Sequence, residues 1–354
     1  MSGLRQLERG VLALVALLAA LAGLANYGQW STVPRFALAT LALAGLAWVV
    51  SFATEQLGEH FGPAVTGMLQ STFGNLPELF VVIFALQKGE LVVAQTAILG
   101  SIFGNALLVL GLVVVVGARR SPDGLMRFSR RLPNDTATLL LVTVFVLVLL
   151  GLSIASHSPA SHHVKAISAV GAVCLLVVYL SWVVPYLRSD ARPQADAERV
   201  APRLSVTAAL VLLIAGGGVS AFVSDWFING LAPAIRVLGI SQAFAGLVIV
   251  GIAGNAVENA SGIVLSWKGH YDHAISVVKN SVAQIAAFLF PALVLLSFAL
   301  STTLTFALAP VYIGALLLTA LALWQVTGDG EAAEFEGWAL VALYVILAAV
   351  TLYD

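Results

Sequence analysis

Long apolar segments, separated by short polar ones, fill almost the whole of this chain. A helix needs about 20 apolar residues to cross a bilayer, and eleven segments meet that requirement. They are residues 10–27, 35–56, 63–86, 91–117, 134–155, 164–187, 204–227, 240–266, 272–299, 303–325 and 335–353. No alternation of apolar and polar residues typical of membrane β-strands recurs. The pattern therefore predicts an all-α polytopic membrane protein with about eleven transmembrane helices.

The composition agrees with a chain that lies mostly in lipid. Of the 354 residues, 60% are hydrophobic and only 10% are charged, which is too much apolar surface for a soluble domain to bury. The net charge of −1 gives no reason to expect a nucleic-acid partner, and a single cysteine excludes an internal disulfide. We expect an integral protein of the cell (inner) membrane, with the lipid bilayer as its surroundings and no cofactor; its oligomeric state is left open.

Lys and Arg are unevenly divided between the two sides that eleven helices would create. Twelve lie on the N-terminal side and four on the other, with Lys279 left inside a predicted helix. Because Lys and Arg collect in cytoplasmic loops, we expect a cytoplasmic N-terminus and an external C-terminus. Lys279 should extend its side chain to the cytoplasmic surface; the alternative is that it pairs with a buried acid.

Two loops contain side chains that could bind a metal ion. The last cytoplasmic loop carries Asp329, Glu331, Glu334 and Glu336, and an outer loop carries His157, His162 and His163. We interpret the acids as a solvated cap on the final helix, in preference to a regulatory cation site. The histidines are interpreted as a solvated loop, because no Cys or acid accompanies them.

A displacement of 180 residues aligns two parts of the chain without a gap. It places Gly74 on Gly254, Asn75 on Asn255, Glu78 on Glu258, Lys88 on Lys268, Gly89 on Gly269 and Ser101 on Ser281. The first Lys-Gly loop lies outside and the second inside, so the copies should be inverted, as in many secondary transporters. We expect an extra N-terminal helix in residues 1–34, a five-helix repeat in 35–187, a cytoplasmic linker in 188–203 and a second five-helix repeat in 204–354.

Each copy places a Gly-Asn pair and a glutamate in the middle of an apolar segment. Glycine loosens the helix, and in the first copy Pro77 also removes a backbone donor. A carboxylate at membrane depth costs about 3 kcal/mol or more, so Glu78 and Glu258 are candidates for a functional site. The second copy has Val257 in place of Pro77, and we therefore expect the two halves to open unequally.

Oxygen ligands gather around the two glutamates if the copies face each other. The candidates are the side chains of Asn75, Asn255, Ser101, Ser281 and Gln284 and the backbone carbonyls near Gly74 and Gly254. Carboxylates with neutral oxygens suit a hard cation such as Ca²⁺. Two facing carboxylates without a cation repel, so protons compete with the cation. Exchange of Ca²⁺ for H⁺ by alternating access follows from such a site.

Three further residues are candidates for a proton or cation path, namely Glu55, Asp225 and Asn105. Alternatives stay open for the neutral ligands. Ser101, Ser281 and Gln284 could equally join helices by hydrogen bonds, and the two asparagines could cap the helix breaks. Glu55 and Asp225 lie near predicted helix ends, where the alternative is a solvated acid.

At these residues the chain resembles the Ca²⁺/H⁺ antiporters of the cation/proton exchanger family, within the cation/Ca²⁺ exchanger superfamily. The motifs that carry the resemblance are Gly74 to Leu79 with Lys88-Gly89, Gly100-Ser101 through Asn105 to Gly111, Gly254 to Glu258, and Ser281 with Gln284. The resemblance covers nearly the whole chain. It implies that Glu78 and Glu258 are alternately protonated Ca²⁺ ligands, with Ser281 and Gln284 as cation or water ligands.

Other functions are less well supported by the sequence. Related sodium/calcium exchangers carry a GTS/GTT-type turn where this chain has Gly-Asn, which favours protons over Na⁺. Exchange of Na⁺, K⁺ or another divalent cation is the main alternative, followed by a passive cation channel. We do not expect an enzyme, because no nucleophile–base pair or HExxH motif occurs.

Overall fold

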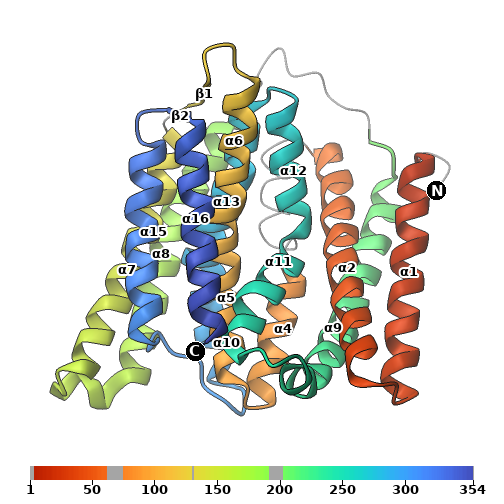
Figure 1. The fold of residues 1–354 in the computed structure, drawn as a ribbon, viewed down its shortest axis with the longest axis horizontal. Helices are drawn as coiled ribbons and strands as arrows, with labels where there is room; N and C mark the ends of the chain where they lie inside the picture. Colours follow the sequence, from red (N-terminus) through yellow and green to blue (C-terminus); the bar gives the residue numbers. More distant parts are fainter. Residues whose placement is uncertain (1–3, 62–74, 130, 191–201, 354) are drawn as a thin grey trace. The chain divides into compact units, whose positions relative to one another are not determined.

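The computed structural model describes residues 4–61, 75–129, 131–190 and 202–353, and this part of the chain is almost entirely helical (Figure 1). The first helices are α1 (Gln6–Tyr27), α2 (Thr32–Phe61), α4 (Leu76–Gln87), α5 (Leu91–Phe103), η1 (Gly104–Val109), α6 (Leu110–Arg120), α7 (Arg131–Ala155), η2 (Pro159–His163) and α8 (Val164–Asp190). The later ones are α9 (Val206–Leu238), α10 (Gln242–Phe244), η3 (Ala245–Val250), α11 (Gly251–Gly254), α12 (Ala256–Trp267), α13 (Tyr271–Gln284), η4 (Ile285–Leu289), α14 (Phe290–Ser297), α15 (Pro310–Thr327) and α16 (Glu334–Leu352).

Nine helical segments within the described residues are long and apolar enough to cross a membrane, and one bent pair would make a tenth. They coincide with predicted segments, which confirms the all-helical polytopic fold. The predicted segment 63–86 is described only from Asn75 onward, where α4 is a short apolar helix.

Two predicted boundaries are wrong. Helix α9 continues to Leu238, because the stretch after residue 227 is still apolar and ends at a left-handed Gly239 (φ 66°). Residues 303–309 are not helical, and α15 begins only at Pro310. Proline is suited to the first turn of a helix, since its missing amide would have no partner there.

The chain divides into two compact units, and each is described by itself. The first comprises Met1–Phe84 and Leu180–Ile240. Within it α2 packs along α9, with the rings of Phe36 and Phe227 at 5.1 Å between centroids. The chain before α9 is fixed by Arg203, whose guanidinium pairs with Glu8 and whose amide donates to Gln56 at 2.8 Å.

The second unit comprises Ala85–Tyr179 and Ser241–Asp354. Helix α16 packs along α6, α12 along α13, and α7 along α15. Three of the helical runs in this unit contain a π-helical turn, at η1, η3 and η4. A π-turn inserts a residue and re-aims the side chains that follow it, and such turns are frequent at functional sites.

The two sequence copies have the same local backbone. Helix α4 begins at Leu76 and ends at Gln87, and α12 begins at Ala256 and ends at Trp267, so both bounds differ by the 180 residues of the repeat. Each helix is followed by a Lys-Gly turn, in which Gly89 has φ 78° and Gly269 has φ 83°. Only glycine adopts this conformation without strain, which explains the repeated Lys-Gly pair.

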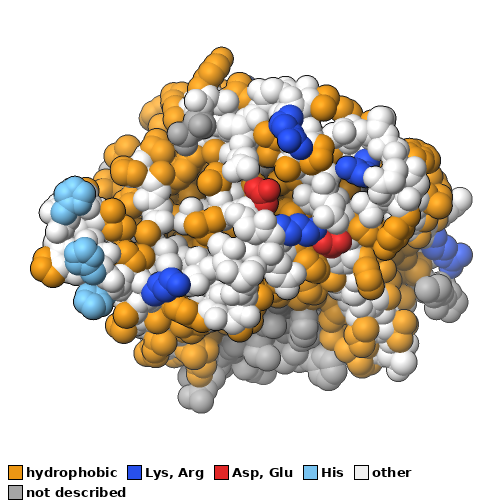
Figure 2. Space-filling model, turned by 90° about the horizontal axis from the view of Figure 1, so that it is seen from below, with side chains coloured by type: hydrophobic (Ala, Val, Ile, Leu, Met, Phe, Trp, Pro, Cys, Tyr) orange, Lys and Arg blue, Asp and Glu red, His pale blue; other side chains and the backbone are white. Residues whose placement is uncertain are grey.

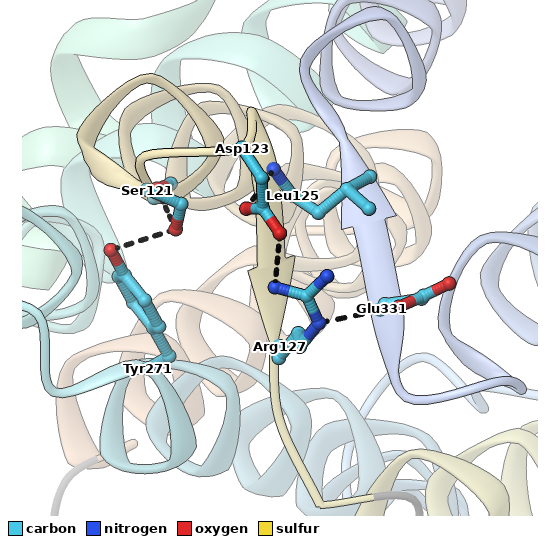
Figure 3. A network of polar contacts seen from close by, with 7 residues as sticks. Ser121, Asp123, Leu125, Arg127, Tyr271 and Glu331 are labelled. Atoms are coloured by element: carbon cyan, nitrogen blue, oxygen red, sulfur yellow. Dashed lines mark hydrogen bonds and ion pairs between the residues drawn. The ribbon is translucent and has the colours of Figure 1, made fainter.

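A short antiparallel ribbon joins two loops of the second unit. Strand β1 (Leu125–Arg127) pairs with β2 (Glu331–Ala333), and Arg127 bonds to both Asp123 (2.6 Å) and Glu331 (3.5 Å). Figure 3 shows these contacts beside the hydrogen bond from Ser121 Oγ to Tyr271 Oη, at 3.1 Å. The ribbon therefore lies next to the first turn of α13.

Candidate functional site

The second Gly-Asn pair is a break in its helix, as the sequence predicts. Helix α11 ends at Gly254, Asn255 has φ −98° and ψ 16°, and α12 begins at Ala256. The helix axis bends by 55° between Gln242–Gly254 and Asn259–Trp267. Because no proline is present here, the break depends on glycine and on the contacts of Asn255.

Four of the predicted site residues form one hydrogen-bonded cluster in the second unit, namely Ser101, Asn105, Asn255 and Ser281. Asn105 Nδ2 lies 2.9 Å from Asn255 Oδ1 and 3.0 Å from Ser281 Oγ. Asn255 Nδ2 donates to Ser101 Oγ at 2.8 Å and to the carbonyl of Gly251 at 2.9 Å. All four side chains are buried, so the cluster joins α5, η1, the helix break and α13 away from solvent.

The cluster forms because two backbones approach each other closely beside it. A Cβ on Gly251 would lie 2.6 Å from the carbonyl carbon of Gly100, and a Cβ on Gly100 would overlap the backbone of Leu247. Glycine is therefore required at both positions. This contact places Ser101, the residue after Gly100, within reach of the Asn255 amide.

The amide hydrogens of the cluster are used within it, while one carbonyl oxygen is left over. Asn105 Oδ1 is buried and accepts no hydrogen bond within the described part of the chain. Its amide also donates to the carbonyl of Ser101, at 3.0 Å. A buried acceptor without a donor is costly, and such an oxygen is suited to binding a hard cation. Asn105 thus lies at the centre of the cluster, where the sequence interpretation had placed it only along a path.

The first copy contributes Asn75 and Glu78 in the first unit. Both side chains are buried, with exposed fractions of 5% and 4%. Helix α4 begins directly after Asn75, whose carbonyl accepts from Leu79 N at 3.0 Å; the carbonyl of Asn255 accepts from Asn259 N at the same distance. Glu78 is therefore in the first turn of its helix, where the helix dipole stabilises a negative charge.

The remaining predicted ligands are described in part. Gly74 and the side chain of Glu258 lie outside the described residues, although the backbone of Glu258 belongs to α12. Gly254 is buried, and Gln284 is half-buried at the end of α13, where η4 begins. Of the predicted neutral ligands, the structure thus brings together Ser101, Asn255 and Ser281.

The two acids proposed for a path lie in different surroundings. Glu55 is exposed near the end of α2, as predicted. Asp225 is not at a helix end, because α9 extends thirteen residues beyond it, to Leu238. Asp225 Oδ2 accepts a hydrogen bond from Asn229 at 3.0 Å, one turn later in the same helix.

Lys279 contradicts the prediction that its side chain reaches the membrane surface. Its side chain is fully buried, and Nζ donates to Thr327 Oγ1 at 2.9 Å. Thr327 in turn donates to the carbonyl of Leu323, at 2.5 Å. The alternative of an acidic partner is also wrong among the described residues, since a hydroxyl takes that place. Because Thr327 on α15 accepts this hydrogen bond, the ammonium of Lys279 has a polar partner inside the protein.

Neither loop cluster forms a metal site within the described residues. His157, His162 and His163 are exposed, and histidine side chains gather at one edge of the face in Figure 2. In the acidic loop, Glu331 and Glu334 pair with Arg127 and Arg119. Glu336 accepts from the backbone amide of Ala333 at 2.7 Å. The interpretation as a cap of the final helix is confirmed for Glu336, whereas Glu331 and Glu334 form ion pairs.

Comparison with known proteins identifies the family. The model of the sodium/calcium exchanger protein family matches residues 31–186 and 208–353. The chain is 32% identical to the vacuolar calcium ion transporter of Schizosaccharomyces pombe, covering 93% of this chain and 81% of the relative. It is 30% identical to the Ca²⁺/H⁺ antiporter of a Synechocystis strain, over 92% of both chains. The solved structure of native YfkE superposes with a TM-score of 0.82 at 26% identity, covering 97% of this chain and all of that one. The protein therefore belongs to the sodium/calcium exchanger protein family.

Proposed function

We propose that this protein is a secondary transporter that exchanges Ca²⁺ for H⁺ across a membrane. Relatives that carry this activity in their names support the proposal. The observation that carries it is Glu78, a buried carboxylate on an apolar helix that starts directly after Asn75. Glu258 has the same place on α12, after Asn255. A buried acid on an apolar helix is expensive, and transport of a cation would explain why Glu78 is kept.

Glu78 and Glu258 are proposed as the residues that bind Ca²⁺ and protons in competition. Ca²⁺ binds when both carboxylates are ionised, because two negative charges compensate the cation. When Ca²⁺ leaves, the uncompensated carboxylates take up protons. The assignment rests on the matching positions of the two acids in the repeat, each in the first turn of a helix that begins after an asparagine.

The amide–hydroxyl cluster would complete and shape this site. Asn105 Oδ1 supplies a neutral oxygen, because its own amide is held by Asn255 and Ser281. Asn255 is proposed as a positioning residue, since both its oxygen and its amide are engaged. Ser281 Oγ, an acceptor for Asn105, keeps a hydroxyl hydrogen and a lone pair for a cation or its water. Asn75, Gln284 and the carbonyls of Gly74 and Gly254 remain further candidate ligands.

Glu55 and Asp225 are proposed to guide cations or protons toward the site. Glu55 is exposed near the end of α2, where an acid attracts cations from water. Asp225 is half-buried within α9, with Asn229 fixing one of its oxygens. An acid at this depth supports a path better than a solvated helix end does.

The orientation is proposed from the charge asymmetry of the loops. The excess of Lys and Arg on the N-terminal side favours a cytoplasmic N-terminus and an external C-terminus in a cell membrane. Alkaline phosphatase fused after Tyr353 would be active if the C-terminus is external. An inactive fusion of normal abundance would contradict this orientation.

Transport in sealed vesicles tests the proposed exchange. Purified protein is reconstituted into vesicles with an acidic interior, and Ca²⁺ uptake is followed together with internal pH. We expect uptake that alkalinises the interior and that stops when an ionophore collapses the pH gradient. Ca²⁺ uptake without proton movement would refute Ca²⁺/H⁺ exchange.

Two further conditions separate the alternatives. Uptake that requires an internal Na⁺ gradient, and proceeds without a pH gradient, would indicate Na⁺ exchange, which the description of the matching family includes. Uptake that follows an imposed membrane potential alone would indicate a passive channel. Each condition uses the same vesicles, so a difference in protein insertion cannot explain the result.

A further inference from the structure

Two arginines at the end of α6 differ in how their charges are compensated. Arg119 Nη2 lies 2.6 Å from Glu334, and the same carboxylate accepts from the indole of Trp338 at 3.1 Å. The charge of Arg119 is thus compensated by Glu334, which Trp338 also contacts. Arg120, the next residue, lies with its guanidinium 4.8 Å from the ring centroid of Trp267. Within the described part of the chain, no carboxylate pairs with Arg120.

A second cation without an acidic partner adjoins this stack. Lys268 directly follows Trp267 and is exposed, and no described carboxylate pairs with it. Helices α6 and α12 pack against each other, and Ser266 Oγ donates to the carbonyl of Val113 at 2.7 Å. Arg120 therefore stacks on the indole of Trp267 at the end of α6, and Lys268 is the next residue after that tryptophan, at the end of α12.

The place of this ring indicates the partner. Trp267 is 59% exposed at the last position of an apolar helix, and tryptophan at such a position lies among lipid headgroups. A cation stacked on an indole there is oriented and partly desolvated. Two such cations without acids attract an anion at the same depth, and the anions found there are lipid phosphates.

We propose that Arg120, Trp267 and Lys268 form a binding site for the headgroup of an anionic phospholipid. The phosphate would bridge the guanidinium and the ammonium, and the indole would lie against the glycerol and upper acyl chain. Such a lipid would link the end of α6 to the turn between α12 and α13. The site is separate from the amide–hydroxyl cluster, and the proposal does not depend on the ion that the protein transports.

Retention of lipids on the purified full-length protein tests the site. Protein in mild detergent is titrated with phosphatidylglycerol or phosphatidylcholine, and bound lipid is counted by native mass spectrometry. We expect the wild type to bind phosphatidylglycerol more tightly, by on the order of tenfold, because each cation near a membrane contributes to anionic lipid affinity. Equal affinity of the wild type for the two lipids would overturn the proposal without any variant.

Variants locate the binding on this part of the surface. The double change Arg120→Gln with Lys268→Gln should remove most of the preference for phosphatidylglycerol. Arg119→Gln is a matched control, because that arginine already has a carboxylate partner. Lys88→Gln is a second control, since Lys88 precedes the equivalent Gly89 turn of the first copy. An unchanged preference in the double variant, or a loss of equal size in the controls, would contradict the site.

Two further measurements cover a soluble anion and a misfolded variant. Inorganic phosphate at millimolar concentration should leave phosphatidylglycerol bound; complete displacement would show a site for free phosphate and overturn the lipid assignment. If the double variant does not purify as a single species, wild type and Trp267→Phe are compared in bilayers with brominated lipids. Brominated phosphatidylglycerol should quench the wild type more than brominated phosphatidylcholine does, and the difference should shrink in Trp267→Phe. Equal quenching by both lipids would refute the proposal.

Discussion

The two copies of the repeat share a backbone but differ in the side chains that produce it. Pro77 is the second residue of α4, and Val257 is the second residue of α12, yet both helices begin after the same asparagine. At this position proline loses no hydrogen bond, because the first amides of a helix have no partner within it. The comparison shows that a helix starts after the asparagine whether its second residue is proline or valine, so proline is compatible with this start but not required for it.

The largest expected effect tests whether the copies are equivalent in function. Glu78→Gln and Glu258→Gln should each lower the rate of Ca²⁺/H⁺ exchange by on the order of a hundredfold, since each removes one of two charges that compensate the cation. Exchange is measured in vesicles under an imposed pH gradient. A large loss for one variant and full activity for the other would show that the copies are not equivalent.

A glutamate outside the apolar helices provides the control for this pair. Glu90 precedes α5 and accepts a hydrogen bond from Gln242 at 3.0 Å. Glu90→Gln should retain exchange within about twofold, because a carboxylate near water can be replaced by an amide at little cost. If it loses as much activity as Glu78→Gln, the loss is not specific to the two glutamates of the repeat.

A smaller effect, on stability, is expected where Gly100 of the first copy packs against Leu247 of the second. Gly100→Ala should lower the free energy of unfolding by about 1–3 kcal/mol, because its methyl group would overlap the backbone of Leu247. Gly104→Ala, one turn later, has nothing within 4 Å of its Cβ and should be neutral or slightly stabilising, as alanine is in helices. Thermal unfolding in detergent measures both. Similar midpoints for the two variants would contradict the close contact.

The repeat and its chemistry could be predicted from the sequence because both depend on spacing. The offset that aligns Glu78 with Glu258 also aligns both ends of α4 and α12. The position of Asn105 could not be predicted in the same way, since Ile285 stands at its equivalent and breaks the symmetry. Its contacts with Asn255 and Ser281 depend on the approach of two backbones, at Gly100 and Gly251, which periodicity does not reveal.

Lys279 was predicted wrongly for a related reason. Its equivalent in the first copy is Leu99, which is fully buried, and Lys279 takes the same kind of position on α13. Lysine in a membrane helix usually extends its ammonium to water at the membrane surface. Here Thr327, on a helix far away in the sequence, supplies a hydroxyl inside the protein, and nothing near Lys279 in the sequence announces it.

Replacing Lys279 by leucine, the residue at the equivalent position 99 of the first copy, tests this difference between the copies. Lys279→Leu should raise the unfolding midpoint by a few degrees, about 2 °C or more, because a buried polar group is replaced by an apolar one of similar size. Thr327→Val, which leaves Nζ without its acceptor, should lower the midpoint. When Lys279→Leu is already present, Thr327→Val should lower the midpoint much less, because no ammonium remains to need the hydroxyl. A stabilised Lys279→Leu protein without exchange activity would instead give Lys279 a role in transport.

The smallest effect is expected in two loops that differ between the copies, those after α6 and α14. The segment after α14 is held by apolar and neutral groups: Phe306 is fully buried, and its amide donates to Ser168 Oγ at 3.1 Å. The loop after α6 is held by charges, and the guanidinium of Arg127, followed by the amide of Leu125, lowers the pKa of the Asp123 carboxyl. The two loops should therefore respond differently to acid.

Because the folded-state pKa of Asp123 lies below the unfolded value of about 3.9, its contribution to stability is present above that value and is lost as the pH falls through the folded pKa. Asp123 is exposed, so Asp123→Asn should lower the unfolding midpoint at pH 7 by only about 1 °C or less. The difference between wild type and variant should vanish when the pH is lowered from 7 to below the folded-state pKa, and also in 1 M salt, where exposed charges are screened. Ser168→Ala, which removes the neutral contact of the other loop, should lower the midpoint equally at both pH values. A salt- and pH-independent effect of Asp123→Asn would show that its hydrogen bond to Leu125, and not its charge, holds the ribbon.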